Sequence, residues 1–195
     1  MALPLLFGDI NMKKIIGIGL LLIILIVGVS FLVNFPIFGN HSDDVNASQQ
    51  SVDYSENGIS LSMPGDWVSA DSKSNESVLA VAKPDPKDSS GFSSINLNIE
   101  KKSKARSLQS EFNSNYNILS RNSDFNILFM GNVSFNGKPA MEAEYTSVSN
   151  NVTKHHRAIW FQEGSDLYVI LCSAPDSQYS DLAGTFDFII NSIKM

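Results

Sequence analysis

The apolar positions of this chain form one unbroken run near the N-terminus and short alternating groups after it. Residues 15–33 contain no charged side chain and a single hydroxyl, that of Ser30. Folded as a helix, this run would be about 28 Å long, close to the thickness of the hydrocarbon core of a bilayer. The pattern therefore predicts one transmembrane helix over residues 15–35.

Charged residues flank this run asymmetrically. Lys13 and Lys14 stand immediately before it, and paired aspartates lie beyond it. Because positive flanks stay in the cytoplasm, we expect residues 1–14 inside the cell and the rest outside, in a single-pass protein of the cell membrane. Gly28-Val29-Ser30 also fits the cleavage site of a signal peptide, which is the alternative. Apolar residues continue to Phe35, and this favours an anchor.

The segment after the predicted helix is mostly polar. It contains proline, glycine and paired aspartates. This composition is typical of a linker, so we expect a flexible spacer over residues 36–52 and an extracytoplasmic domain over residues 53–195. Translation starts either at Met1 or at Met12, where Lys13 and Lys14 follow directly.

Within the predicted domain, apolar and polar residues alternate in short groups bounded by turn signals. Ile59, Leu61 and Met63 share one face of a predicted strand, the first of the sheet. A short apolar strand is expected over 78–82. Alternation over 95–99 predicts a strand that is buried on one face only.

Two segments repeat apolar residues with the period of a helix. Spacings of 4, 4 and 3 between Leu108 and Leu119 predict an amphipathic helix over 107–121, with Ser107 as its N-cap. Spacings of 4, 3 and 4 predict a second, closing helix over 177–193.

Four predicted strands follow one another between these helices. They cover residues 125–135, 140–149, 154–161 and 167–172, and Asn136-Gly137 marks a tight hairpin turn. Because the strands do not alternate one by one with helices, we expect an α+β fold with an antiparallel sheet. The two helices would cover its two faces, preceded by the transmembrane helix.

Several stretches resemble one family. "YSENGISLSMPGDW" (54–67) is similar to the opening of PsbP-like domains, and "FNGKPAMEAEYT", "DLYVILCSAP" and "FDFIINSIK" also resemble that family and its DcrB-like relatives. The resemblance covers about residues 53–194 and implies an α/β/α sandwich around an antiparallel sheet. Founding members are extrinsic subunits that stabilise a photosynthetic membrane complex, and many relatives are membrane-anchored. No photosynthetic role is implied here, since this chain has a predicted anchor where the founders are soluble.

The charge of the predicted exported part is acidic. The chain carries 14 basic and 20 acidic residues, and without Lys13, Lys14 and Asp9 the remainder has 12 and 19, a net charge of −7. This excludes a nucleic-acid-binding role, which needs a concentrated basic face. The single cysteine, Cys172, excludes an intrachain disulfide and a lipid anchor after the apolar run.

One basic cluster stands out against this acidic background. Lys101, Lys102, Lys104 and Arg106 form either a solvated connection or a docking patch for an acidic partner or anionic headgroups. The Asn-x-Ser/Thr acceptors at Asn46 and Asn75 lie in loop-like positions and are the candidates for glycosylation.

The residue types that carry chemistry do not form a recognisable site. His155 and His156 are adjacent on a predicted strand, so their rings should point to opposite faces and cannot chelate one metal together. Glu142 and Glu144 share a strand face, where Glu144 is expected diagonal to Arg157 as a charge partner. We expect no catalytic residue, no metal and no cofactor, and a buried, inert thiol at position 172.

The two tryptophans are expected to fill the core. Trp67 comes where the chain leaves a predicted strand, and Trp160 lies within another. The whole pattern favours a membrane-anchored, extracytoplasmic, non-catalytic domain that binds and stabilises or assists a membrane or envelope protein complex. The alternative is a binder of a small ligand or envelope component, using a cleft beside the sheet.

Overall fold

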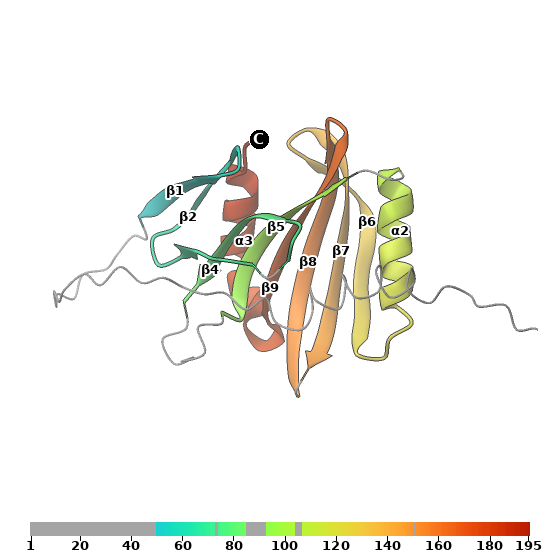
Figure 1. Ribbon diagram of the computed structural model, residues 1–195. Helices are drawn as coiled ribbons and strands as arrows, with labels where there is room; N and C mark the ends of the chain where they lie inside the picture. Colours follow the sequence, from blue (N-terminus) through green and yellow to red (C-terminus); the bar gives the residue numbers. More distant parts are fainter. Residues whose placement is uncertain (1–49, 73, 85–92, 104–106, 150) are drawn as a thin grey trace, which may run out of the picture.

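The computed structural model describes residues 50–72, 74–84, 93–103, 107–149 and 151–195 (Figure 1). The predicted cytoplasmic segment 1–14, the transmembrane helix 15–35 and most of the spacer 36–52 lie outside these residues. Within the described part, none of the helices has the length and apolar character needed to cross a bilayer.

The described residues form strands around two helices. Their order along the chain is β1 (Ser51–Glu56), β2 (Ile59–Pro64), β3 (Val68–Ser69), β4 (Ser77–Lys83), β5 (Ile95–Ser103), α2 (Leu108–Leu119), β6 (Phe125–Phe135), β7 (Lys138–Ser149), β8 (Val152–Glu163), β9 (Asp166–Pro175) and α3 (Asp176–Ser192).

Seven of these strands form one antiparallel sheet in the order β3-β4-β5-β9-β8-β7-β6. The predicted meander β6 to β9 is confirmed, and β5 joins it beside β9. The Asn136-Gly137 turn has positive φ at both residues, +50° and +75°, as a two-residue hairpin turn requires. The two helices lie on opposite faces, so the predicted α+β architecture is confirmed for the described domain.

Each helix covers its own hydrophobic core. On one face α2 packs Phe112, Tyr116 and Leu119 against β7, β8 and β9. Trp160 is 4% exposed there and donates a hydrogen bond from Nε1 to Tyr116 Oη at 3.1 Å. Ser107 caps α2 by accepting from the Ser110 N–H, as predicted.

The other core lies between α3, the sheet and the β1-β2 hairpin. Trp67, 3% exposed, meets Phe186 of α3 edge-on at 6.0 Å between ring centroids. Ile59, Leu61 and Met63 of β2 belong to the same core. The prediction that β2 is the first strand of the main sheet is wrong, because β2 pairs only with β1 in a separate two-stranded sheet that packs on α3.

Two further predictions need correction. The sequence pattern does not predict β1 and places its first residues, Ser51 and Val52, in the spacer. All residues of β1 but Tyr54 are exposed, so the strand has no buried face that would produce an alternating pattern. β5 was expected to be half-buried, but Asn98 and Glu100 are 0% exposed on the face opposite its apolar residues. Asn98 accepts from Ser77 Oγ at 2.6 Å, which compensates for its burial.

Candidate functional site

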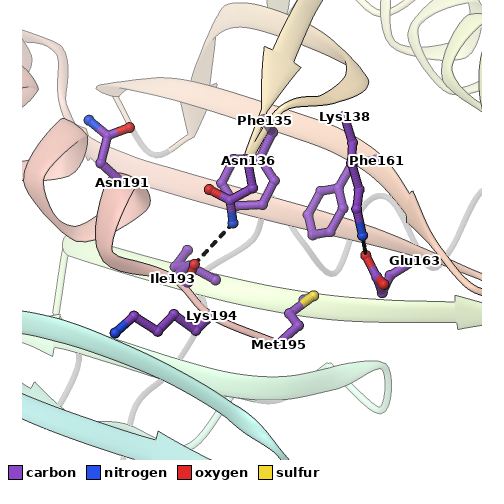
Figure 2. Close-up of a pocket in the computed structure, with 9 residues that line it drawn as sticks. All are labelled: Phe135, Asn136, Lys138, Phe161, Glu163, Asn191, Ile193, Lys194 and Met195. Carbon is purple, nitrogen blue, oxygen red and sulfur yellow. Dashed lines mark hydrogen bonds and ion pairs between the residues drawn. The ribbon is translucent and has the colours of Figure 1, made fainter.

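A cleft of about 450 Å³ opens where the end of α3 meets the β6-β7 hairpin and the end of β8 (Figure 2). Its floor contains Phe135 and Phe161, whose ring centroids are 4.6 Å apart. Asn136 donates from Nδ2 to the Ile193 carbonyl at 3.0 Å and so ties the hairpin to the chain after α3. The remaining lining residues are Lys138, Glu163, Asn191, Lys194 and Met195.

The charges of this cleft are partly neutralised. Lys138 and Glu163 form an ion pair across one end, while Lys194 extends away from that pair (Figure 2). The Lys194 backbone is fixed, since its N–H and C=O both bond to Ser60. The volume suits a small ligand, but the cleft is open to solvent and its lining mixes apolar and polar side chains. Two shallower depressions, of about 390 and 260 Å³, lie beside the N-terminus of α2 and between α3 and the β1-β2 hairpin.

The two adjacent histidines point to opposite faces of β8, as predicted. His156 is 2% exposed and lies between two serines, with Ser147 Oγ 2.8 Å from Nε2 and Ser173 Oγ 2.8 Å from Nδ1. Its ring stacks on Tyr145 at 4.8 Å. Burial, reinforced by the charges of Lys154 and His155, lowers the pKa of His156 to about 3. It is therefore a neutral, hydrogen-bonded core residue at physiological pH.

His155 lies on the α3 side of the sheet. Its ring stacks on Tyr179, with 3.6 Å between centroids. Nδ1 is 3.3 Å from Asp176 Oδ1, and Nε2 is 3.5 Å from Glu144 Oε2, within ion-pairing distance but without a hydrogen bond. The helix thus holds this imidazole between two carboxylates.

Glu142 and Glu144 share the α3 face, but their partners differ from the prediction. Arg157 is directly opposite Glu144 rather than diagonal to it. Its guanidinium instead reaches diagonally to Glu142 at 3.1 Å and to Asp187 of α3 at 2.5 Å. The carboxylate of Asp187 on α3 attracts the guanidinium of Arg157 away from Glu144. Strand alternation alone cannot predict this contact with a helix.

The thiol of Cys172 is enclosed beside this ion-pair network. It is 0% exposed, and burial raises its pKa well above the ordinary value. Among the described residues, no three His, Cys, Asp or Glu side chains are placed to hold a metal ion. In this part of the chain, His156 is thus held by two serines, Arg157 by two carboxylates, and the thiol of Cys172 is closed off from solvent.

Comparison with known proteins adds the family to this geometry. The family model of the PsbP-like protein matches residues 16–195. The chain belongs to the PsbP-like family. No functionally curated protein matches the sequence.

Solved structures share the fold of this PsbP-like domain. Cyanobacterial PsbP (CyanoP) from Synechocystis sp. PCC 6803 aligns with a TM-score of 0.56 and 15% identity, over 80% of this chain and 98% of that one. LpqN, described as involved in cell envelope biogenesis of Mycobacterium tuberculosis, gives 0.51 and 13%, over 76% and 92%. The Saccharomyces cerevisiae Ran-binding protein Mog1p gives 0.50 and 10%, over 75% and 96%. At these identities the likeness establishes the fold.

Of the basic cluster, the structure of this PsbP-like domain describes only Lys101 and Lys102. Lys101 and Lys102 are neighbours on β5, so alternation sends them to opposite faces. Lys101 pairs with Asp166 at 3.0 Å, and Lys102 pairs with Glu76 and, at 3.3 Å, with Glu100. Lys104 and Arg106 lie outside the described residues.

Of the two glycosylation candidates, the structure describes Asn75. Asn75 is exposed in the turn that precedes β4, a position that an attached glycan would not crowd. Asn46 lies outside the described residues.

One exposed surface of the PsbP-like domain escaped the sequence reasoning. Among the strands that the structure describes, β6 is the last of the sheet and pairs only with β7. Three consecutive apolar side chains, Leu128, Phe129 and Met130, are 50%, 45% and 41% exposed. The signal that could have revealed it is the absence of any charged residue from Phe125 to Phe135.

Proposed function

We propose that this protein is a membrane-anchored, extracytoplasmic PsbP-like domain that binds to and stabilises or assists a membrane or envelope protein complex, without catalysing a reaction. The N-terminus would be cytoplasmic, and the helix over 15–35 would hold the domain at the outer surface of the cell membrane. The resemblance to cyanobacterial PsbP and to LpqN, whose description places it in envelope biogenesis, supports this class of role.

The observation that supports it best is how the reactive side chains are used in the described domain. His156 is enclosed between two serines, Arg157 is held by two carboxylates, and Cys172 is fully buried. The surface depressions are open; the cleft of Figure 2 is lined by both charged and aromatic residues, and the other two are lined by uncharged polar and apolar residues. A protein that works by surface recognition needs no free catalytic group, and an interface uses mixed surfaces of this kind.

This function is tested by purifying the tagged full-length protein from its native membranes in a mild detergent and quantifying what co-purifies. We expect one membrane or envelope protein in near-stoichiometric amount. A double variant, Lys101→Glu with Lys102→Glu, tests the predicted docking cluster, and Lys83→Glu at a distant exposed ion pair is its matched control. Recovery of the tagged protein alone would contradict the proposal.

The cleft in Figure 2 favours a second candidate function, binding of a small ligand or envelope component. Its aromatic floor and its asparagine amides are the elements that such a site uses. The test is to record amide chemical shifts of the isotope-labelled full-length protein while envelope extracts are added. Shifts confined to Asn136, Ile193 and their neighbours would support this function, and unchanged spectra would exclude it.

A further inference from the structure

The outer edge of β6 leaves backbone groups without a strand partner. Over its eleven residues, Phe125–Phe135, β6 pairs with β7 on one side only. On the other side, Phe125 donates its N–H to Asn122, and the described residues supply no backbone partner beyond it. An edge of this kind is a template for pairing with a further strand.

Proteins usually protect such edges with charges, prolines or very short strands. The opposite edge of this sheet follows the rule, because β3 has only two residues. β6 has neither a charged residue nor a proline. Its protection is limited to one irregularity, a register shift between Ile127 and Phe129. The long edge is therefore open to pairing from Phe129 onward.

The side chains of the edge point to the kind of strand it accepts. The ring of Phe129 lies over Gly131, so closely that an added Cβ would be 2.6 Å from Phe129 Cζ. Glycine thus makes room on the strand for an exposed aromatic ring. A small residue opposite Phe129 on a paired strand would leave the ring of Phe129 in place, and the backbone of that strand would cover the ring.

We propose that β6 pairs with β6 of a second copy of this chain, antiparallel about a two-fold axis beside Met130. This register sets Phe129 opposite Gly131 of the second copy and Met130 opposite its own equivalent. The two Phe129 rings become diagonal neighbours, within reach of each other across the strands. Phe129 then faces a small residue, Met130 faces its own equivalent, and Leu128 faces the uncharged Asn132, so the edge is complementary to itself, as a two-fold interface requires.

Charge and geometry are compatible with this dimer. No residue from 125 to 135 is charged, so no like charges face each other across the new pair. Repulsion between the acidic copies acts at longer range and is screened within about 8 Å at physiological salt. The β1-β2 hairpin, by which the chain enters the domain, packs on α3 and β4, towards the other edge of the sheet (Figure 1). The predicted anchors would therefore sit at the outer ends of the pair.

The test is disulfide trapping of the full-length Met130→Cys variant in its native membranes. The native thiol of Cys172 is 0% exposed and should not react. Val152→Cys is the matched control, because Val152 is similarly exposed, at 49% against 41%, but lies on β8 away from the edge. We expect mild oxidation to convert Met130→Cys to a covalent homodimer and to leave Val152→Cys and the wild-type chain monomeric.

A second variant checks the dimer without a new thiol. Met130→Lys should convert dimers to monomers in lipid nanodiscs, as counted by single-molecule photobleaching, while Val152→Lys should not. Equal trapping at positions 130 and 152, or trapping of Met130→Cys to a different protein, would overturn the homodimer. The homodimer and the proposed binding of another membrane protein are tested separately. Finding a partner protein would not establish the homodimer, and finding the homodimer would not establish a partner protein.

Discussion

His156 should make the stability of this domain depend on pH in a way that a surface histidine would not. The native state holds the imidazole neutral between Ser147 and Ser173, with its pKa lowered to about 3 by burial. In the unfolded chain the ring regains an ordinary pKa of about 6.5. Below that pH the imidazole of His156 binds a proton in the unfolded state but stays neutral in the folded state.

The sign and size of the effect follow from proton linkage. Because the folded pKa is depressed, the stabilising contribution is complete above about pH 6.5 and is lost progressively as the pH falls toward 3. Between pH 7 and pH 4.5 the free energy of unfolding should fall by about 2.5 kcal/mol through this residue alone. This is a large part of the 5–15 kcal/mol that typically stabilises a folded domain.

The assay is urea unfolding of the full-length protein in a mild non-ionic detergent, followed by tryptophan fluorescence. Trp67 and Trp160 lie one in each core, so their combined emission follows the unfolding of both. The same measurement on His156→Gln removes the titrating group, so the carboxylates, which titrate in both proteins, cancel in the difference. His156→Gln should be destabilised by about 1–3 kcal/mol at pH 7, because its buried hydrogen bonds are perturbed.

Between pH 7 and pH 4.5 the gap between wild type and His156→Gln should close by about 2.5 kcal/mol. If both proteins lose stability in parallel, His156 is not held neutral in the native state. The inference that Ser147 and Ser173 enclose a neutral His156 would then be wrong.

Three further outcomes follow from the packing. The thiol of Cys172 should react with a thiol reagent only after unfolding, because burial raises its pKa and closes access to it; rapid native labelling at pH 8 would contradict this. Gly184→Ala should raise the free energy of unfolding by about 0.5–1 kcal/mol, because Gly184 lies within α3 and no atom is near the added Cβ. Gly137→Ala should lower the free energy of unfolding by about 1 kcal/mol, because φ is +75° at this turn position. Trp160→Phe should cost about 1–3 kcal/mol in urea unfolding, because the buried hydroxyl of Tyr116 loses its donor; a loss under 0.5 kcal/mol would show that the hydroxyl finds another partner.

The sequence predicted the elements whose pattern is local. The apolar stripe of α2, the Asn136-Gly137 turn and the meander β6 to β9 each depend on residues near one another in the chain. β1 could not be predicted in this way, because Tyr54 is its only partly buried residue and the strand is defined by its pairing with β2. The burial of Asn98 and Glu100 likewise depends on the tertiary environment of β5 and not on alternation.

The candidate site was predictable only in part. Alternation separated His155 from His156 correctly, but it could not predict that Ser147 and Ser173 would enclose His156 from two other strands. Arg157 was expected to pair with Glu144, and it turned to Asp187 because α3 brings a carboxylate within reach. The open edge at β6 becomes visible only when the order of the strands is known.

The proposed role of the domain, binding a membrane or envelope protein, is tested most directly by crosslinking in native membranes. A membrane-impermeant, amine-reactive crosslinker would be applied to cells that carry the full-length protein, and the linked peptides would be identified by mass spectrometry. We expect crosslinks from lysines of residues 53–195 to one recurring membrane or envelope protein. Recovery of crosslinks within the domain, with none to another protein, would contradict it.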